Sequence, residues 1–217
     1  MSREVVISKT YDEPLVDKAE ILRYAGVRGG ADGDIIVLLD ECLALAKDKL
    51  RYDTCFCDVN VSISGDEVHL GNIAVCSHSL SRALCDCDRA VVFAASVGLE
   101  IDRLIARQSA ISPAKALLLE AIGNERVESL CDALCSDIAA EKMRYGYKTR
   151  PRFSAGYGDM PLAAQKDIFA LLDCQKRIGV SLNQSLLMTP SKSVTAIIGI
   201  YKYYIGEKNE NNRVFEE

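Results

Sequence analysis

The residues whose types and spacing could do chemistry are concentrated in one short stretch, "PRFSAGYGDMPLAAQ", residues 151–165. In it, Arg152 precedes a turn of small residues that contains Gly156, Tyr157 and Gly158. A guanidinium can hold a carboxylate through two hydrogen bonds, and glycine lets backbone groups approach a ligand closely. The alternative is an ordinary loop in which Arg152 pairs with a surface acid and the glycines only make turns. Spacing alone favours this alternative.

The end of the same stretch has the features of a helix start. Asp159 is a suitable N-cap residue, and Pro161 suits the first turn of a helix. We therefore predict that Asp159 caps a helix over residues 161–174. On this interpretation Asp159 and Pro161 are structural, and ligand contacts come from residues 152–157.

Other catalytic patterns are missing from the sequence. It contains no GxSxG, no HExxH and no GxxxxGK[ST], and the glycine-rich segment 25–33 has the wrong period for GxGxxG. With only two histidines, general acid–base work would fall on carboxylates, tyrosines or cysteines. We therefore assign no catalytic residue.

The nine cysteines are best interpreted as buried structural thiols. Their number is odd and the chain is not a small secreted one, which argues against a disulfide framework. The two CxC pairs, at 55–57 and 85–87, lack the spacing of zinc ligands. Alternation on a strand puts Cys55 and Cys57 on one face. We expect no metal site.

Composition and charge exclude several classes of function. The chain of 217 residues is 49% hydrophobic and has a net charge of −5, with no long basic block, which argues against nucleic acid binding. No apolar run approaches the length of a membrane span. The first residues lack the apolar region of a signal peptide, so we expect a cytoplasmic protein.

The elements that must position the candidate loop follow from periodicity and end signals. A long helix is predicted from Ser112-Pro113 to about Tyr145, and a doubly buried strand over 89–98. Gly65-Asp66 marks a hairpin turn, Asp34 precedes an amphipathic helix, and Ser77 or Ser79 caps a short one. The expected strands are 3–8, 54–64, 67–70, 89–98, 178–182 and 194–201, and the helices are 14–27, 35–50, 77–87, 99–110, 112–145 and 161–174.

These elements predict an α+β fold, a single compact domain over residues 1–217. Its mixed or antiparallel sheet has helices around it and one long central helix. We divide the domain into an N-terminal α/β part of about 1–110, a part with the long helix and the candidate loop over 111–205, and a polar tail over 206–217.

Two segments of the sequence resemble a known family. "RFSAGYGDMPLAAQKDIFALL" and "IGVSLNQSLLMTPSKSVTAIIGI" are similar to the activation domain of cobalamin-dependent methionine synthase, and more closely to short stand-alone proteins that carry this domain. The family signature R-x-x-x-G-Y, which binds S-adenosylmethionine, is satisfied by Arg152, Gly156 and Tyr157. The resemblance covers residues 112–200, and the segment 21–46 also looks like the stand-alone members.

The resemblance implies roles for individual residues. Arg152 would hold the carboxylate of S-adenosylmethionine, the backbone around Ser154 and Gly156 would meet its amino or adenine groups, and Tyr157 would form a wall. An acid from the long helix corresponds to Glu128, for which a solvated helix glutamate is the alternative.

The family also uses a tyrosine near the C-terminus. Tyr201, Tyr203 and Tyr204 lie in this region, and we take Tyr203. Three positions depart from the family pattern: Ala155 replaces a proline, and Asn183 and Gln184 replace threonine and glutamate.

The function implied by the resemblance is the reactivation of a cobalamin methyltransferase, as a component of cobalamin-dependent methionine synthase. An inactive cob(II) corrinoid on a partner protein is reduced by one electron, from a donor such as flavodoxin, and is methylated by S-adenosylmethionine. Because cobalt is the nucleophile, this chain needs no base; its work is positioning. Two alternatives stay open: a module that binds S-adenosylmethionine and serves another corrinoid protein without its own catalysis, and a structural member without a ligand.

Overall fold

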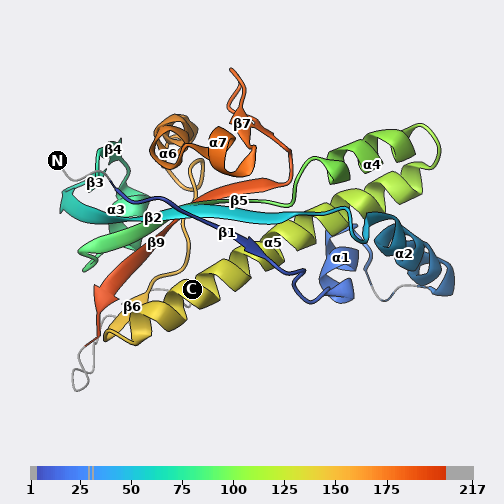
Figure 1. Cartoon of the computed structure of the whole chain (residues 1–217), viewed down its shortest axis with the longest axis horizontal. Helices are drawn as coiled ribbons and strands as arrows, with labels where there is room; N and C mark the ends of the chain where they lie inside the picture. The colour runs from blue at the N-terminus through green and yellow to red at the C-terminus, as the bar shows by residue number, and fades with distance from the viewer. Residues whose placement is uncertain (1–3, 29, 31, 204–217) are drawn as a thin grey trace.

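The structure, a computed structural model, describes residues 4–28, 30 and 32–203. The described residues form a seven-stranded antiparallel sheet in the order β4-β3-β2-β5-β9-β6, with β1 paired to the free edge of β2 (Figure 1). A separate hairpin joins β7 and β8. The strands are β1 Ile7–Tyr11, β2 Tyr52–Ser64, β3 Glu67–Leu70, β4 Ile73–Cys76, β5 Arg89–Ser96, β6 Tyr147–Thr149, β7 Ser181–Leu182, β8 Met188–Thr189 and β9 Ser193–Lys202.

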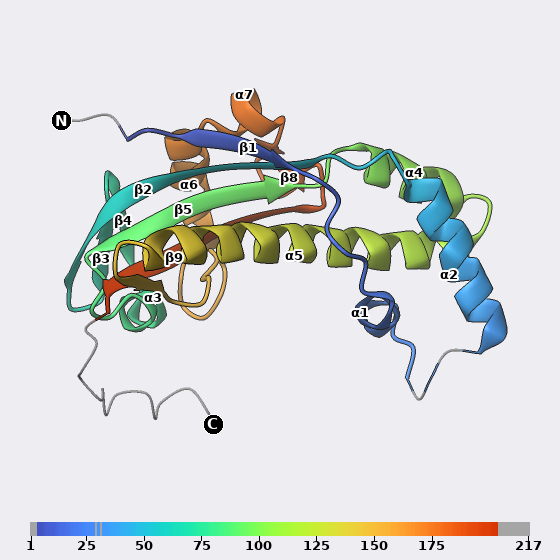
Figure 2. The ribbon, with the colours of Figure 1, turned by 60° about the horizontal axis from the view of Figure 1, so that its bottom comes forward.

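Helices cover both faces of the sheet. Helix α5 runs along one face, and α6 and α7 lie on the other (Figure 2). The helices are α1 Lys18–Tyr24, α2 Gly33–Ala46, α3 His78–Ala83, α4 Glu100–Ser109, α5 Pro113–Met143, η1 Leu162–Ala164, α6 Gln165–Leu172 and α7 Cys174–Ile178. The α+β prediction with a long central helix is therefore confirmed, and the sheet is antiparallel.

The core has two layers because alternate residues of the central strands point to opposite faces. On β5, Phe93 packs on the α5 side and Val92 on the α6 side, and both are fully buried. The prediction that this strand is buried on both faces is confirmed. Cys55 and Cys57 share the α6 side, as alternation on a strand predicts.

Helix α5 begins as the sequence predicts. The Ser112 side chain accepts a hydrogen bond from the Lys115 amide, and Pro113 occupies the first turn. Its apolar stripe packs on the sheet, with Leu119, Ile122 and Leu130 fully buried. The predicted hairpin between β2 and β3 and the Ser77 cap of α3 are also confirmed.

Several predicted boundaries at the N-terminal end are wrong. The first strand begins at Ile7 and not at residue 3, because an edge strand takes its register from its partner, here with Tyr11 opposite Tyr52. Helix α2 begins at Gly33 and not at residue 35, and it is capped by Asp32, whose carboxylate accepts a bond from the Ile35 amide at 3.0 Å. The polar tail 206–217 lies outside the described residues.

Candidate functional site

The chain after β6 extends the edge of the sheet and turns Arg152 toward α5. Phe153 exchanges two backbone hydrogen bonds of 2.8 Å with Ile197 of β9. Successive side chains in extended backbone point to opposite faces. Phe153 accordingly packs in the α6 layer, whereas Arg152 reaches the middle of α5.

Two carboxylates of α5 hold the Arg152 guanidinium. Its Nη2 lies 2.5 Å from Glu128 Oε2 and 3.3 Å from Asp132 Oδ1. Positions 128 and 132 are one helical turn apart, so both acids face the same loop. The Nη1 atom of Arg152 is buried and has no hydrogen-bond partner among the described residues. The arginine is thus fixed by carboxylates while one of its nitrogens stays unused.

Three further side chains border this pair. Burial raises the pKa of Tyr24, at the end of α1, and Glu128 raises it further, which places the phenol near that carboxylate. Burial also raises the pKa values of the Cys131 and Cys135 thiols, and the positive charge of Arg152 offsets only part of this rise. Sequence reasoning missed Tyr24 because α1 and α5 meet only through the tertiary fold, and no local pattern connects residues 24 and 128.

The turn after Arg152 is closed by its own backbone. Gly156 has φ +85°, and its N–H donates to the Met160 carbonyl at 3.0 Å. The Tyr157 N–H donates to the Ser154 carbonyl at 3.2 Å. Tyr157 is 70% exposed, and its ring meets the Phe153 ring edge to face with the centroids 5.5 Å apart. The turn therefore presents an aromatic face to solvent beside the extended segment that carries Arg152.

Asp159 does not cap the helix that follows it, so that prediction is wrong. Its carboxylate instead accepts bonds from the Ser77 hydroxyl at 2.6 Å and from the amides of His78 and Ser79 at 2.8 and 3.0 Å. These are the free donors at the start of α3, which a carboxylate satisfies well. The hydrogen bond from Ser77 and those from the two amides hold the pKa of Asp159 well below its usual range. Asp159 thus ties the turn to α3, a contact across 80 residues.

Tyr203 lies with other partners. Its N–H donates to the Gly146 carbonyl at 2.9 Å, and the Lys148 ammonium sits 3.6 Å from its ring centroid. This position is at the end of β9 beside β6, next to the last turn of α5. The structure therefore brings Glu128 and Arg152 into direct contact, joins Ser154, Gly156 and Tyr157 to them through one turn, and places Tyr203 with the edge strand.

Asn183, which stands where the family pattern has threonine, has a local structural role. Its side-chain oxygen accepts a bond from the Leu187 amide at 2.9 Å, inside the hairpin of β7 and β8. Leu186 in that turn has φ +63°. Asparagine suits such a turn because its short side chain can bond to nearby backbone. Gln184 is exposed.

The part of the chain that the structure describes has neither a metal-binding cluster nor a membrane-spanning helix. No group of three or more His, Cys, Asp or Glu side chains there could hold a metal ion. No helix in the same part of the chain is long and apolar enough to cross a membrane. All nine cysteines are free thiols, but Cys76 and Cys85 are exposed, so the prediction of buried thiols is wrong for these two.

The site is thus an arginine loop at the edge of the sheet, held against two acids of a long helix. Comparison with protein families matches residues 82–203 to the vitamin B12 dependent methionine synthase, activation domain. The match spans more than half of the sequence, and the chain belongs to this family.

Solved structures support the same fold. One is described as the crystal structure of the MetH reactivation domain bound to AdoHcy; it is 17% identical to this chain, with a TM-score of 0.66. The similarity covers 93% of this chain and 81% of that one. No curated protein matches the sequence.

Proposed function

We propose that this chain binds S-adenosylmethionine at Arg152 and serves as a reactivation subunit for a cobalamin-dependent methionine synthase on a partner protein. The observation that carries the proposal is the state of Arg152, the first residue of R-x-x-x-G-Y. Its guanidinium is held by two carboxylates and keeps a buried nitrogen without a partner among the described residues. A carboxylate ligand can replace the helix acids on the exposed side of this guanidinium, whose side chain is 26% exposed. The related reactivation domain, described as bound to AdoHcy, supports the same ligand class.

The other residues of the turn fit the remaining parts of such a ligand. Glu128, 39% exposed at its side chain, can take the ligand ammonium once the ligand carboxylate occupies Arg152. The exposed Tyr157 ring offers a flat surface for adenine. Because the Gly156 N–H already bonds to Met160, the contact expected from Gly156 is through its carbonyl oxygen. Ser154 and Tyr203 remain proposed contacts of the same site.

The work of this chain is to bind and orient, which explains why no nucleophile or base is needed. A corrinoid held by the partner protein supplies the cobalt nucleophile that accepts the methyl group. Arg152 and Glu128 fix the amino acid end of S-adenosylmethionine, and Tyr157 limits the position of the adenosyl end. Holding reactants in one geometry accounts for a large part of such a rate. We also propose a cytoplasmic location, and an electron donor such as flavodoxin as the second partner.

Calorimetric titration of the whole chain with S-adenosylmethionine tests the ligand. We expect Arg152→Ala to weaken binding by about tenfold or more, because a charge-assisted contact is lost. Arg150→Ala is the matched control: this arginine lies two residues away, donates to the Cys85 carbonyl and stacks on Tyr201. No binding by the wild type, or equal binding by Arg152→Ala, contradicts the proposal.

A second experiment tests the reactivation role. An inactivated corrinoid methionine synthase is supplied with S-adenosylmethionine and a reductant, with and without this chain. Recovery of turnover only when the wild-type chain is added supports reactivation. Binding of S-adenosylmethionine without any recovery instead supports a module that serves another corrinoid protein.

A further inference from the structure

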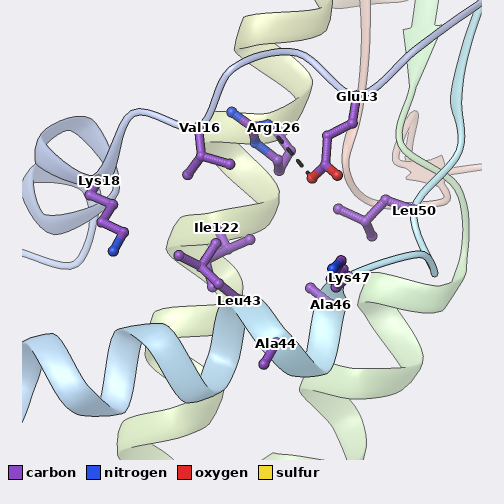
Figure 3. Close-up of a pocket in the computed structure, with 10 residues that line it drawn as sticks. All are labelled: Glu13, Val16, Lys18, Leu43, Ala44, Ala46, Lys47, Leu50, Ile122 and Arg126. Carbon is purple, nitrogen blue, oxygen red and sulfur yellow. Dashed lines mark ion pairs between the residues drawn. The ribbon is translucent and has the colours of Figure 1, made fainter.

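A cavity of about 300 Å³ lies at a different place, between α2, α5 and the segment that precedes α1 (Figure 3). We call this segment, residues 13–17, the strap. The cavity has the size and composition of small-molecule sites, which are mostly apolar with a few placed polar groups. It is lined by Glu13, Val16, Lys18, Leu43, Ala44, Ala46, Lys47, Leu50, Ile122 and Arg126.

The floor of the cavity is apolar and well packed. Ile122 of α5 and Ala46 of α2 are buried, at 0% and 4% exposure, and Leu43 and Leu50 are half-buried beside them. Val16 of the strap is 39% exposed and lies opposite Leu43 and Ile122 in Figure 3. This floor suits an aliphatic or thioether side chain, which gains free energy in proportion to the apolar area it buries.

A buried ion pair fixes the wall on the strap side. Arg126, 1% exposed, donates to the carbonyls of Pro14 and Leu15 at 2.6 and 2.7 Å. Burial opposes its charge, but Glu125, in direct contact, raises the pKa of the guanidinium. Glu125 also accepts from the Asp17 amide at 3.1 Å. These contacts hold the strap in place, and Glu125 balances the charge of Arg126.

Two opposite charges at the rim are not paired with each other. A third charge at the rim, the Lys18 ammonium, forms an ion pair with Asp40 Oδ1 at 2.6 Å. Glu13 accepts from the Tyr52 hydroxyl at 3.1 Å and lies 3.9 Å from Arg126. No ion pair within the described ranges joins Glu13 to Lys47, and Figure 3 shows Leu50 between them. The rim therefore offers one carboxylate and one ammonium above an apolar floor.

We propose that this cavity binds a free α-amino acid with an aliphatic or thioether side chain. The ligand ammonium bonds to Glu13, its carboxylate bonds to Lys47, and its side chain packs on Val16 and Leu43. A zwitterion complements the separated charges, whereas a ligand with only one charge leaves one of them unmatched. The proposal does not depend on S-adenosylmethionine binding at Arg152.

Calorimetric titration of the whole chain with L-leucine and L-methionine tests the site. Leucinamide lacks the carboxylate and 4-methylpentanoate lacks the ammonium, so we expect each to bind about tenfold or more weakly than leucine. Glu13→Gln and Lys47→Met are expected to weaken leucine binding by a similar factor. Lys49→Met is the matched control, because Lys49 lies two residues after Lys47 and does not line the cavity. Thermal melts of every variant confirm that it is folded.

The possible results separate this proposal from that for Arg152. Binding of leucine or methionine that survives Arg152→Ala and is lost in Glu13→Gln and Lys47→Met supports the amino acid site. Absence of heat with both amino acids at about 10 mM overturns it. Equal affinity for leucine and leucinamide, or wild-type affinity in both variants, overturns it as well.

Discussion

Arg152 and Glu128 form an ion pair that joins the loop after β6 to the middle of α5, across 24 residues of sequence. The pair is partly exposed, at 26% and 39% of the two side chains, so water screens much of its attraction. Its main effect is to orient the guanidinium rather than to stabilise the fold. A ligand that competes for Arg152 therefore meets only a small free-energy cost.

We expect Glu128→Gln to lower the free energy of unfolding by no more than about 1 kcal/mol, as for other partly exposed pairs. The same change is expected to weaken S-adenosylmethionine binding, because the proposed partner of the ligand ammonium loses its charge. Denaturant unfolding and calorimetry measure the two effects. Glu141→Gln, farther along α5 and beside Lys142, is the control and is expected to leave ligand affinity unchanged.

Asp159→Asn is expected to lower the melting temperature at neutral pH, because the start of α3 loses a charged acceptor. The pKa of Asp159 is lowered in the folded chain, so its stabilisation is present above the ordinary aspartate range and is lost as the pH falls. The difference in melting temperature between wild type and variant is therefore expected to shrink below about pH 4. Melting curves from neutral to acid pH measure it. A difference in melting temperature that grows on acidification contradicts a stabilising role for the ionised Asp159.

Gly156→Ala is expected to destabilise the turn by about 1–2 kcal/mol, since left-handed backbone is costly for alanine. An added Cβ would also lie 3.1 Å from a methyl group of Leu162. Gly146→Ala separates the two causes, because Gly146 has φ +77° and nothing within 4 Å of its added Cβ. A larger loss of unfolding free energy at Gly156 than at Gly146 shows the contribution of the Leu162 contact.

Alkylation of the native chain is expected to label Cys76 and Cys85 first, since both thiols are exposed. Burial raises the pKa of Cys57 to about 12 and that of Cys87 to about 11, so both stay protonated near neutral pH. Only the thiolate reacts readily. Peptide mapping by mass spectrometry after limited iodoacetamide treatment gives the order. Early labelling of Cys57 contradicts the buried-thiol interpretation.

Local signals predicted the elements that carry their own start and stop residues. Ser112-Pro113 marked α5, Gly65-Asp66 marked the hairpin of β2 and β3, and the apolar run of β5 indicated burial on both faces. The errors arose where a distant partner decides the outcome. Asp159 looks like a helix cap in sequence, but the free amides it satisfies belong to α3.

The candidate site was predictable only in part for the same reason. The loop with Arg152 has a local pattern, and the resemblance selected Glu128 on the long helix. The second acid, Asp132, and the phenol of Tyr24 come from the packing of helices, which sequence spacing does not encode. Asn183 shows the converse: a departure from the family pattern that the local turn explains.

Because α5 is one uninterrupted helix of 31 residues, it fixes the spacing between the cavity and the loop with Arg152. Ile122 and Arg126 border the cavity, and Glu128 and Asp132 face the loop, about 9 Å farther along the axis at 1.5 Å per residue. Helix α1 contacts α5 between these two places: the Asp17 amide at its start donates to Glu125, and Tyr24 at its end lies near Glu128. A displacement of α1 against α5 would therefore change the surroundings of both the cavity and the Arg152 loop.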